Sequence, residues 1–128
     1  MTLVVDASAV TAIMFGETGG ATIQAHVRGE TLIAPQLIDY ELANACWKRI
    51  RRAPATQAAV LGMLASVDRF SITRVSVQAA DVVALATRTG LTAYDAAYLW
   101  LAHSRDLELV TLDSQLARVD QAMRERFD

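Results

Sequence analysis

The chain has 128 residues, of which 53% are hydrophobic and 20% are charged, and its formal net charge is −2 at pH 7. This composition is typical of a globular protein and excludes a disordered one, while the small negative charge gives no reason to expect nucleic-acid binding from the field of the whole protein. The single Cys46 excludes an internal disulfide, and without a Cys/His cluster it argues against a structural zinc site.

We expect one compact domain that spans residues 1–128, because a chain of this length can bury roughly two thirds of its unfolded surface. No run of 18 apolar residues occurs in the sequence, and Asp6 interrupts the apolar stretch near the N-terminus. Neither a transmembrane helix nor a signal peptide is therefore expected. Together with the single cysteine, these features predict a soluble, cytoplasmic protein without membrane contact.

The first half of the chain predicts two short strands and four helices. We expect strands at residues 3–5 and 31–34, and helices at residues 7–15, 20–28, 37–52 and 55–67. Residues that start or stop helices stand between these segments, at Gly16, Gly29, Pro35 and Pro54.

The second half continues the alternation. We expect strands at residues 70–75 and 107–112, and helices at residues 76–89, 91–105 and 114–127. Ser76 is expected to cap the first of these helices and Gly90 to end it. The order of elements is then β, α, α, β, α, α, β, α, α, β, α, which favours a three-layer α/β/α fold around a mostly parallel sheet of four strands.

Four acidic residues stand at positions that such a fold brings to one edge. Asp6 and Asp113 follow the first and last predicted strands, and ligands collect outside the carboxyl ends of parallel strands. Glu41 and Asp95 lie on predicted helices among mostly apolar neighbours. Four carboxylates from distant segments are typical of a site for hard divalent cations, Mg²⁺ or Mn²⁺, which prefer oxygen ligands.

Each acid also has an ordinary structural explanation, and these alternatives stay open at this point. Asp6 and Asp113 could simply form turns at strand ends. Glu41 could share a surface stripe with Lys48, and Asp95 could belong to a capping box begun by Thr92. If Asp95 does lie at a helix N-terminus, we expect the helix dipole to lower its pKa and keep it ionised.

A dense basic cluster follows Glu41 on the same predicted helix. Its members are Lys48, Arg49, Arg51 and Arg52. One interpretation is a surface that contacts phosphates of RNA or an acidic partner. The other is a solvated helix end whose charges complement the helix dipole.

The motifs that contain the four acids resemble those of the PIN-domain nucleases, and most closely the VapC-type toxins of bacterial and archaeal toxin–antitoxin operons. The matching segments are Val4 to Ser8, Ala34-Pro35 followed by Tyr40 to Asn44, Leu91 to Ala102, and Val110 to Leu116. They occur in the expected order across nearly the whole chain. The Thr-x-Tyr-Asp-Ala and Thr-x-Asp segments are specific in combination.

The resemblance implies an endoribonuclease in which the four acids bind one or two Mg²⁺ or Mn²⁺ ions and hydrolyse RNA phosphodiester bonds. It implies that Ser8 and Thr92 support the acids through their hydroxyl groups, with Asn44 as a further supporting residue. It also implies a cognate antitoxin that neutralises the enzyme, and a homodimer formed through the helices between residues 37 and 67. Many relatives add an edge strand after the last acid, and the charged, helix-like residues 117–128 leave open whether a fifth strand exists here.

Two alternatives compete with this interpretation. A non-catalytic PIN-like module that binds only RNA or protein would lack one of the acids, and all four are present. A receiver-like phosphoacceptor domain would need a second acid beside Asp6 and a lysine after a late strand. Lys48 is the only lysine in the sequence, which argues against the receiver.

Overall fold

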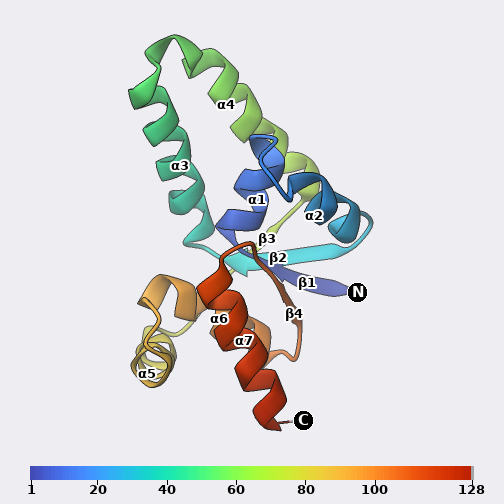
Figure 1. Cartoon of the computed structure of the whole chain (residues 1–128), viewed down its shortest axis with the longest axis vertical. Coiled ribbons are helices and arrows are strands. Elements are labelled where there is room, and N and C mark those ends of the chain that lie inside the picture. Colours follow the sequence, from blue (N-terminus) through green and yellow to red (C-terminus); the bar gives the residue numbers. More distant parts are fainter. Residues whose placement is uncertain (128) are drawn as a thin grey trace.

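The computed structural model describes residues 1–127 as a parallel sheet with helices on both faces (Figure 1). The strands are β1 (Thr2–Val5), β2 (Thr31–Pro35), β3 (Thr73–Val75) and β4 (Glu108–Val110). The helices are α1 (Ala7–Met14), α2 (Gly20–Val27), α3 (Ile38–Arg52), α4 (Gln57–Ser66), α5 (Ala79–Thr89), α6 (Ala93–Ser104) and α7 (Ser114–Phe127). Two short 3₁₀ segments, η1 (Pro54–Thr56) and η2 (Val67–Phe70), flank α4.

The sheet has the strand order β3-β2-β1-β4, and every neighbouring pair is parallel. The chain therefore moves outward from β1 through β2 to β3, and then returns to place β4 on the other side of β1. This reversal creates a switch point between β1 and β4, where Val5 pairs with Val110. The crevice outside the carboxyl ends of two such strands is the usual ligand position in open α/β sheets.

The helices form two layers that bury the sheet from both sides. Figure 1 shows α1 to α4 on one face and α5 to α7 on the other. The strand residues Leu3, Val4 and Val5 are fully buried, as expected for a parallel strand that is covered on both faces. No helix within the described residues is both long and apolar enough to cross a membrane.

Helix α6 is the most deeply buried helix, which fixes its N-terminal end near the sheet. It packs against β1, β2 and β4, and its buried residues include Ala96, Ala97, Tyr98, Leu99, Leu101 and Ala102. The prediction that this segment is a buried helix is confirmed. Thr92 caps it, because the Thr92 hydroxyl accepts a hydrogen bond from the Asp95 backbone N–H at 3.2 Å.

Helices α3 and α4 form a long hairpin that rises from the sheet (Figure 1). Ile38, Leu42 and Cys46 are the buried residues of α3 and attach its first three turns to the core. The last turn of α3 carries Arg49, Arg51 and Arg52. Because a helix rises about 1.5 Å per residue, this basic end lies roughly 12–16 Å along the axis from Glu41.

The predicted order of elements and the four-stranded α/β/α architecture are confirmed, but three boundaries were wrong. The strand expected at 70–75 is only Thr73–Val75, because the preceding residues form η2 and Ser71 adopts a left-handed conformation with φ of 50°. Ser76 does not cap α5, which begins at Ala79 after an extended segment. The last strand ends at Val110 rather than residue 112, and residues 114–127 form α7 rather than a fifth strand.

Candidate active site

Asp6 lies at the end of β1 and is the only charged residue among the buried polar positions described, with 4% of its surface exposed. Its backbone N–H donates to the Val110 carbonyl, which extends the β1–β4 pairing by one residue. Its side chain caps α1 by accepting from the Ala9 backbone N–H at 3.0 Å. The expected turn and cap role is therefore real, and the same contacts fix the carboxylate at the switch point.

Two hydroxyl groups hold the Asp6 carboxylate between β1 and β4. Ser8 donates to one carboxylate oxygen at 2.7 Å, and Thr111 donates to the other at 2.5 Å. Each hydroxyl has one proton, and in both residues that proton is donated to Asp6. In turn, the backbone N–H of Leu112 donates to the Ser8 oxygen, and that of Asp113 donates to the Thr111 oxygen. The network therefore joins the two strand ends and holds the Asp6 carboxylate and the Asp113 backbone in place.

The environment of Asp6 favours proton uptake despite these donors. Burial is the main cause and raises its pKa, and the negative charge of Asp113 raises it further. The hydrogen bonds from Thr111, Ser8 and Ala9 act in the opposite direction because they stabilise the ionised form. Asp6 is thus a buried acid whose ionised form is stabilised by these three hydrogen-bond donors.

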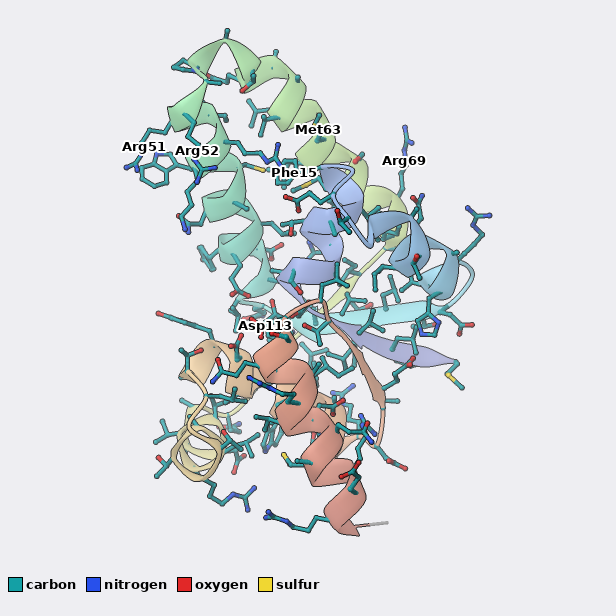
Figure 2. The ribbon with its side chains drawn as sticks, in the orientation of Figure 1. Phe15, Arg51, Arg52, Met63, Arg69 and Asp113 are labelled. Carbon is teal, nitrogen blue, oxygen red and sulfur yellow. The ribbon has the colours of Figure 1, made fainter. Side chains whose placement is uncertain are left out.

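Asp113 caps α7 at the end of the loop that leaves β4. Its carboxylate accepts from the Leu116 backbone N–H at 2.9 Å. Figure 2 shows Asp113 where the start of α7 meets the carboxyl ends of the strands. Its expected structural role as a turn or cap former is again observed, at a position where its charge acts on Asp6 and Asp95.

Glu41 lies in the first turn of α3 and is tied to α6 by a hydrogen bond. The Tyr98 hydroxyl donates to the Glu41 carboxylate at 2.6 Å, and the Tyr98 side chain is 1% exposed. Burial raises the pKa of Glu41, the Tyr98 bond opposes this effect, and the charges of Asp6 and Asp95 add to it. Burial and the contact with Glu41 also raise the pKa of Tyr98, so its hydroxyl stays protonated and remains a donor.

Asp95 lies in the first turn of α6, where its backbone is capped by Thr92. Our expectation that the helix dipole lowers the pKa of Asp95 is wrong. Its pKa is raised, first by burial and then by the negative charges of Asp113 and Asp6. At this position, desolvation and repulsion between carboxylates outweigh the favourable helix terminus.

The structure thus brings together all four acids that the sequence singled out. The pKa values of Asp6, Glu41 and Asp95 are each raised in part by the negative charge of at least one other acid of the four. Within residues 1–127, no three Asp, Glu, His or Cys side chains are placed so that they could hold a metal ion as they stand. Three of the carboxylates are instead bound to protein donors, which are Thr111 and Ser8 for Asp6, Tyr98 for Glu41 and the Leu116 N–H for Asp113.

Comparison with known proteins identifies the fold family. The PIN domain family matches residues 3–122. The chain belongs to the PIN-domain family. It is 38% identical to "Ribonuclease VapC3" of Pyrobaculum aerophilum over 122 residues, covering 91% of this chain and 93% of that protein. It is 31% identical to "Ribonuclease VapC9" of Mycobacterium tuberculosis over 120 residues, covering 94% and 92% respectively.

Two further relatives extend the comparison to structure and to a different activity name. The crystal structure of PAE2754 from Pyrobaculum aerophilum aligns with a TM-score of 0.77 and 32% identity, covering 93% of this chain and 84% of that one. A protein named "Exonuclease VapC9" from Pyrobaculum aerophilum is 36% identical over 88 residues, or 68% of this chain and 65% of that one. The resemblance to VapC-type PIN ribonucleases is confirmed.

The basic cluster of this PIN domain lies apart from the acids, along a groove between α1, α3 and α4. The groove has a volume of about 550 Å³, and Lys48, Arg49 and Arg52 line it. Phe15 and Met63 also line it, and Figure 2 shows both on the side of α3 that faces α4. Arg49 stacks on the Phe15 ring at 3.8 Å, so it is partly used in packing.

The remaining member of the cluster, Arg51, faces a different neighbour. Its guanidinium lies 4.7 Å from the centroid of the Trp47 ring. Arg49 additionally pairs with Glu17 at 3.1 Å. Within the described residues, Lys48 and Arg52 form neither an ion pair nor a cation–π contact, and both line the groove, so they are the members of the cluster that remain for contact with a partner.

Two residues that hold the acids of the PIN domain, Thr111 and Tyr98, were not predicted from the sequence. Thr111 stands two positions before Asp113, and Ser8 stands two positions after Asp6. This spacing of a hydroxyl residue from each strand-end acid could have indicated Thr111 as a supporting residue. Tyr98 lies on a helix that is apolar almost all round, and a buried tyrosine usually needs a partner for its hydroxyl. Asn44, expected to support the acids, is exposed one turn beyond Glu41.

Proposed function

We propose that this chain is a single-domain, metal-dependent endoribonuclease of the VapC toxin type that hydrolyses RNA phosphodiester bonds in the cytoplasm. The observation that carries the proposal is the convergence of Asp6, Glu41, Asp95 and Asp113 at the switch point of the sheet. Helix capping explains where two of these acids, Asp6 and Asp113, lie along the chain. It does not explain why four like charges share one region in which burial and repulsion raise the pKa of three of them.

The donor set fits one or two Mg²⁺ or Mn²⁺ ions, which the four acids would hold. Carboxylate oxygens are the preferred ligands of these ions. The two histidines and the single cysteine, which would favour other metals, lie outside the group of four acids. His26 and His103 bind Glu108 and Asp120 respectively, and Cys46 is buried in α3. When bound, such ions activate water and neutralise charge on the phosphoryl group during hydrolysis.

The other residues of the site prepare the acids for this task. Ser8 and Thr111 stabilise the ionised form of the buried Asp6 and fix both of its oxygens. Tyr98, on the buried helix α6, stabilises the ionised form of Glu41 through one carboxylate oxygen. Thr92 acts on the backbone, because it caps α6 and so sets the position of Asp95.

Cleavage of total cellular RNA by the purified chain is the direct test. We expect cleavage with Mg²⁺ or Mn²⁺, none with chelator, and a loss of roughly 100-fold or more in Asp6→Asn and Asp95→Asn. Asp81→Asn is the matched control, because Asp81 is also a first-turn acid, on α5, but lies outside the cluster. Equal cleavage by Asp95→Asn and Asp81→Asn would exclude the assignment.

A circular RNA substrate distinguishes an endonuclease from an exonuclease. This distinction matters because one relative is named an exonuclease and the others ribonucleases. An endonuclease linearises a circular RNA of defined sequence, whereas an exonuclease leaves it intact. Sequencing the 5′ ends of the products would also identify the cleaved position.

We also propose that a cognate VapB-type antitoxin neutralises this chain and that Lys48 and Arg52 contribute to its binding. The groove they line shares none of its lining residues with the acid cluster, which favours a partner over the scissile RNA. Expression of the chain alone should be toxic, and co-expression of the neighbouring small open reading frame should relieve the toxicity. The double variant Lys48→Glu/Arg52→Glu should weaken antitoxin binding, whereas a loss of RNA cleavage with normal antitoxin binding would assign the cluster to RNA.

Homodimer formation through α3 and α4 belongs to the same proposal. The hairpin exposes Trp47, Leu61 and Met63, which are large apolar side chains that a second copy could cover. Light scattering of the purified chain measures the mass directly. A monomeric mass at all accessible concentrations would contradict the dimer without affecting the nuclease assignment.

A non-catalytic PIN-like module remains the second candidate, and the cleavage test separates it from the enzyme. The strand order argues against the receiver-like alternative. Receiver domains place their strands in the order 2-1-3-4-5, whereas this sheet has the order β3-β2-β1-β4. Lys48, the only lysine, lies in the C-terminal half of α3 and not after a strand of this sheet.

A further inference from the structure

Two exposed tyrosines flank the acid cluster on different helices. Tyr40 on α3 is 79% exposed and Tyr94 on α6 is 67% exposed, which places both among the most exposed large side chains of the described residues. Each directly precedes a site acid, Glu41 or Asp95. Successive helical residues point about 100° apart, so the acid turns inward while the preceding ring stays at the rim.

Both rings line one cavity. Its volume is about 500 Å³, and its lining residues are Leu37, Tyr40, Glu41, Asn44 and Tyr94. This volume falls within the range of small-molecule sites and can accommodate a planar heterocycle. The cavity is continuous with the active site because Glu41 belongs to both.

The residues that line the cavity favour binding of a nucleotide base over binding of a phosphate group. No lysine or arginine lines the cavity, and its one charged group is the carboxylate of Glu41. A phosphate group would therefore be repelled. Aromatic rings instead offer flat faces on which unpaired bases stack, and the Asn44 amide supplies a donor and an acceptor for a base edge.

We propose that Tyr40 and Tyr94 form a stacking subsite for an unpaired base of the RNA substrate, beside the phosphate that is cleaved. This inference rests on the proposed ribonuclease function and specifies its substrate as a single-stranded segment. A base in a duplex is stacked on its neighbours and cannot enter the cavity without being flipped out. The two tyrosines act as positioning residues that place the adjoining phosphate next to the four acids.

Binding of a nuclease-resistant 2′-O-methyl RNA decamer, measured by fluorescence anisotropy in Mg²⁺, tests the subsite without chemistry. Tyr40→Leu and Tyr94→Leu remove the aromatic faces but keep apolar bulk. Each should weaken binding by about 10- to 100-fold, because one aromatic stack on a base contributes roughly 1–3 kcal/mol. The matched variants Tyr40→Phe and Tyr94→Phe keep the ring and should bind within about twofold of the wild type.

Two further ligands identify what the rings recognise. With an oligomer of the same backbone that carries abasic positions, the Leu variants and the wild type should bind equally. With a duplex of the same sequence, they should also bind equally. In cleavage assays, the Leu variants should raise KM for single-stranded RNA, whereas a structural role would lower activity on all substrates alike.

The possible outcomes separate the subsite from the nuclease assignment. If the wild type cleaves RNA but the Leu variants bind the decamer as well as the Phe variants do, the stacking subsite is wrong and the nuclease stands. If the Leu variants lose affinity for the antitoxin but not for RNA, the cavity receives a protein and the proposal is also wrong. If the wild type fails to cleave any RNA, the proposed function itself has failed. Because both rings are exposed, circular dichroism should show all four variants folded.

Discussion

Thr111→Val removes one hydroxyl at nearly constant volume and tests whether the link between β1 and β4 stabilises an ionised Asp6. The substitution deletes the bond from Thr111 to the buried Asp6 carboxylate. It also deletes the acceptor for the Asp113 backbone N–H, which lies 3.0 Å from the Thr111 oxygen. Both lost partners belong to the candidate site, so the effect on stability reports on the site directly.

The magnitude follows from the two lost hydrogen bonds. A hydrogen bond to a charged group contributes about 1.5–3 kcal/mol, and a neutral one about 0.5–1.5 kcal/mol. We therefore expect the metal-free variant to lose about 2–4 kcal/mol of unfolding free energy at neutral pH. Domains of this kind have roughly 5–15 kcal/mol to lose, so the variant should still fold.

The pH dependence distinguishes the loss of an ionic hydrogen bond from a packing defect. The pKa of Asp6 is raised in the folded protein, so the folded state binds its proton first and this group favours folding as the pH falls. Without Thr111 the pKa rises further, and the variant gains more stability on acidification than the wild type. The difference between them should be full above the folded pKa of Asp6 in the variant, should shrink as the pH falls from there to the lower folded pKa of Asp6 in the wild type, and should stay constant below it.

Urea denaturation in chelator at several pH values measures this difference. Thr111→Ser keeps the hydroxyl and should recover most of the loss. Thr87→Val is the matched control, because the exposed Thr87 hydroxyl binds only the Val83 carbonyl of its own helix, and it should change stability by less than about 0.5 kcal/mol. A cost for Thr111→Val that is the same at acidic and neutral pH would refute the role assigned to Asp6 ionisation.

Three other outcomes follow from the geometry. Tyr98→Phe keeps the ring but removes the hydrogen-bond donor to Glu41, which raises the pKa of Glu41 further. The acidic limb of the pH–rate profile should therefore move to higher pH. Cleavage should also slow about tenfold, which corresponds to a loss of about 1.5 kcal/mol. Asp95→Asn should raise the Tm of the metal-free protein while it removes cleavage, because it relieves repulsion from Asp6 and Asp113; an unchanged or lower Tm would contradict this. Mg²⁺ should raise the Tm of the wild type in a concentration-dependent manner, and thermal scans of Asp6→Asn should show a much smaller increase.

The fold could be predicted because strong local signals repeat along the chain. Short apolar strands alternate with helices that glycine or proline residues end, and this pattern left few arrangements other than a parallel sheet. The errors occurred where local chemistry was ambiguous. Ser76 has a good capping side chain, yet the chain stays extended there because the Gln36 N–H donates to the Val75 carbonyl and holds the segment against β2.

The site could be predicted only as a set of acids, because the residues that hold them are defined by three-dimensional contacts. Thr111 and Tyr98 act on Asp6 and Glu41 over 105 and 57 positions of sequence respectively. No spacing rule indicates such pairs. The pKa of Asp95 was predicted in the wrong direction for the same reason, since the helix terminus is visible in sequence but the charges of distant residues are not.

The structural and functional explanations for the acids turn out to be compatible rather than competing. Asp6 caps α1 and Asp113 caps α7, and each cap fixes a carboxylate at the switch point between β1 and β4. A cap by itself could be supplied equally well by serine or asparagine, which carry no charge. Charged residues at both caps, with Asp95 and Glu41 added from α6 and α3, place like charges together where burial already disfavours them. That arrangement costs stability in the free protein, and binding of divalent cations by the four carboxylates would offset the cost.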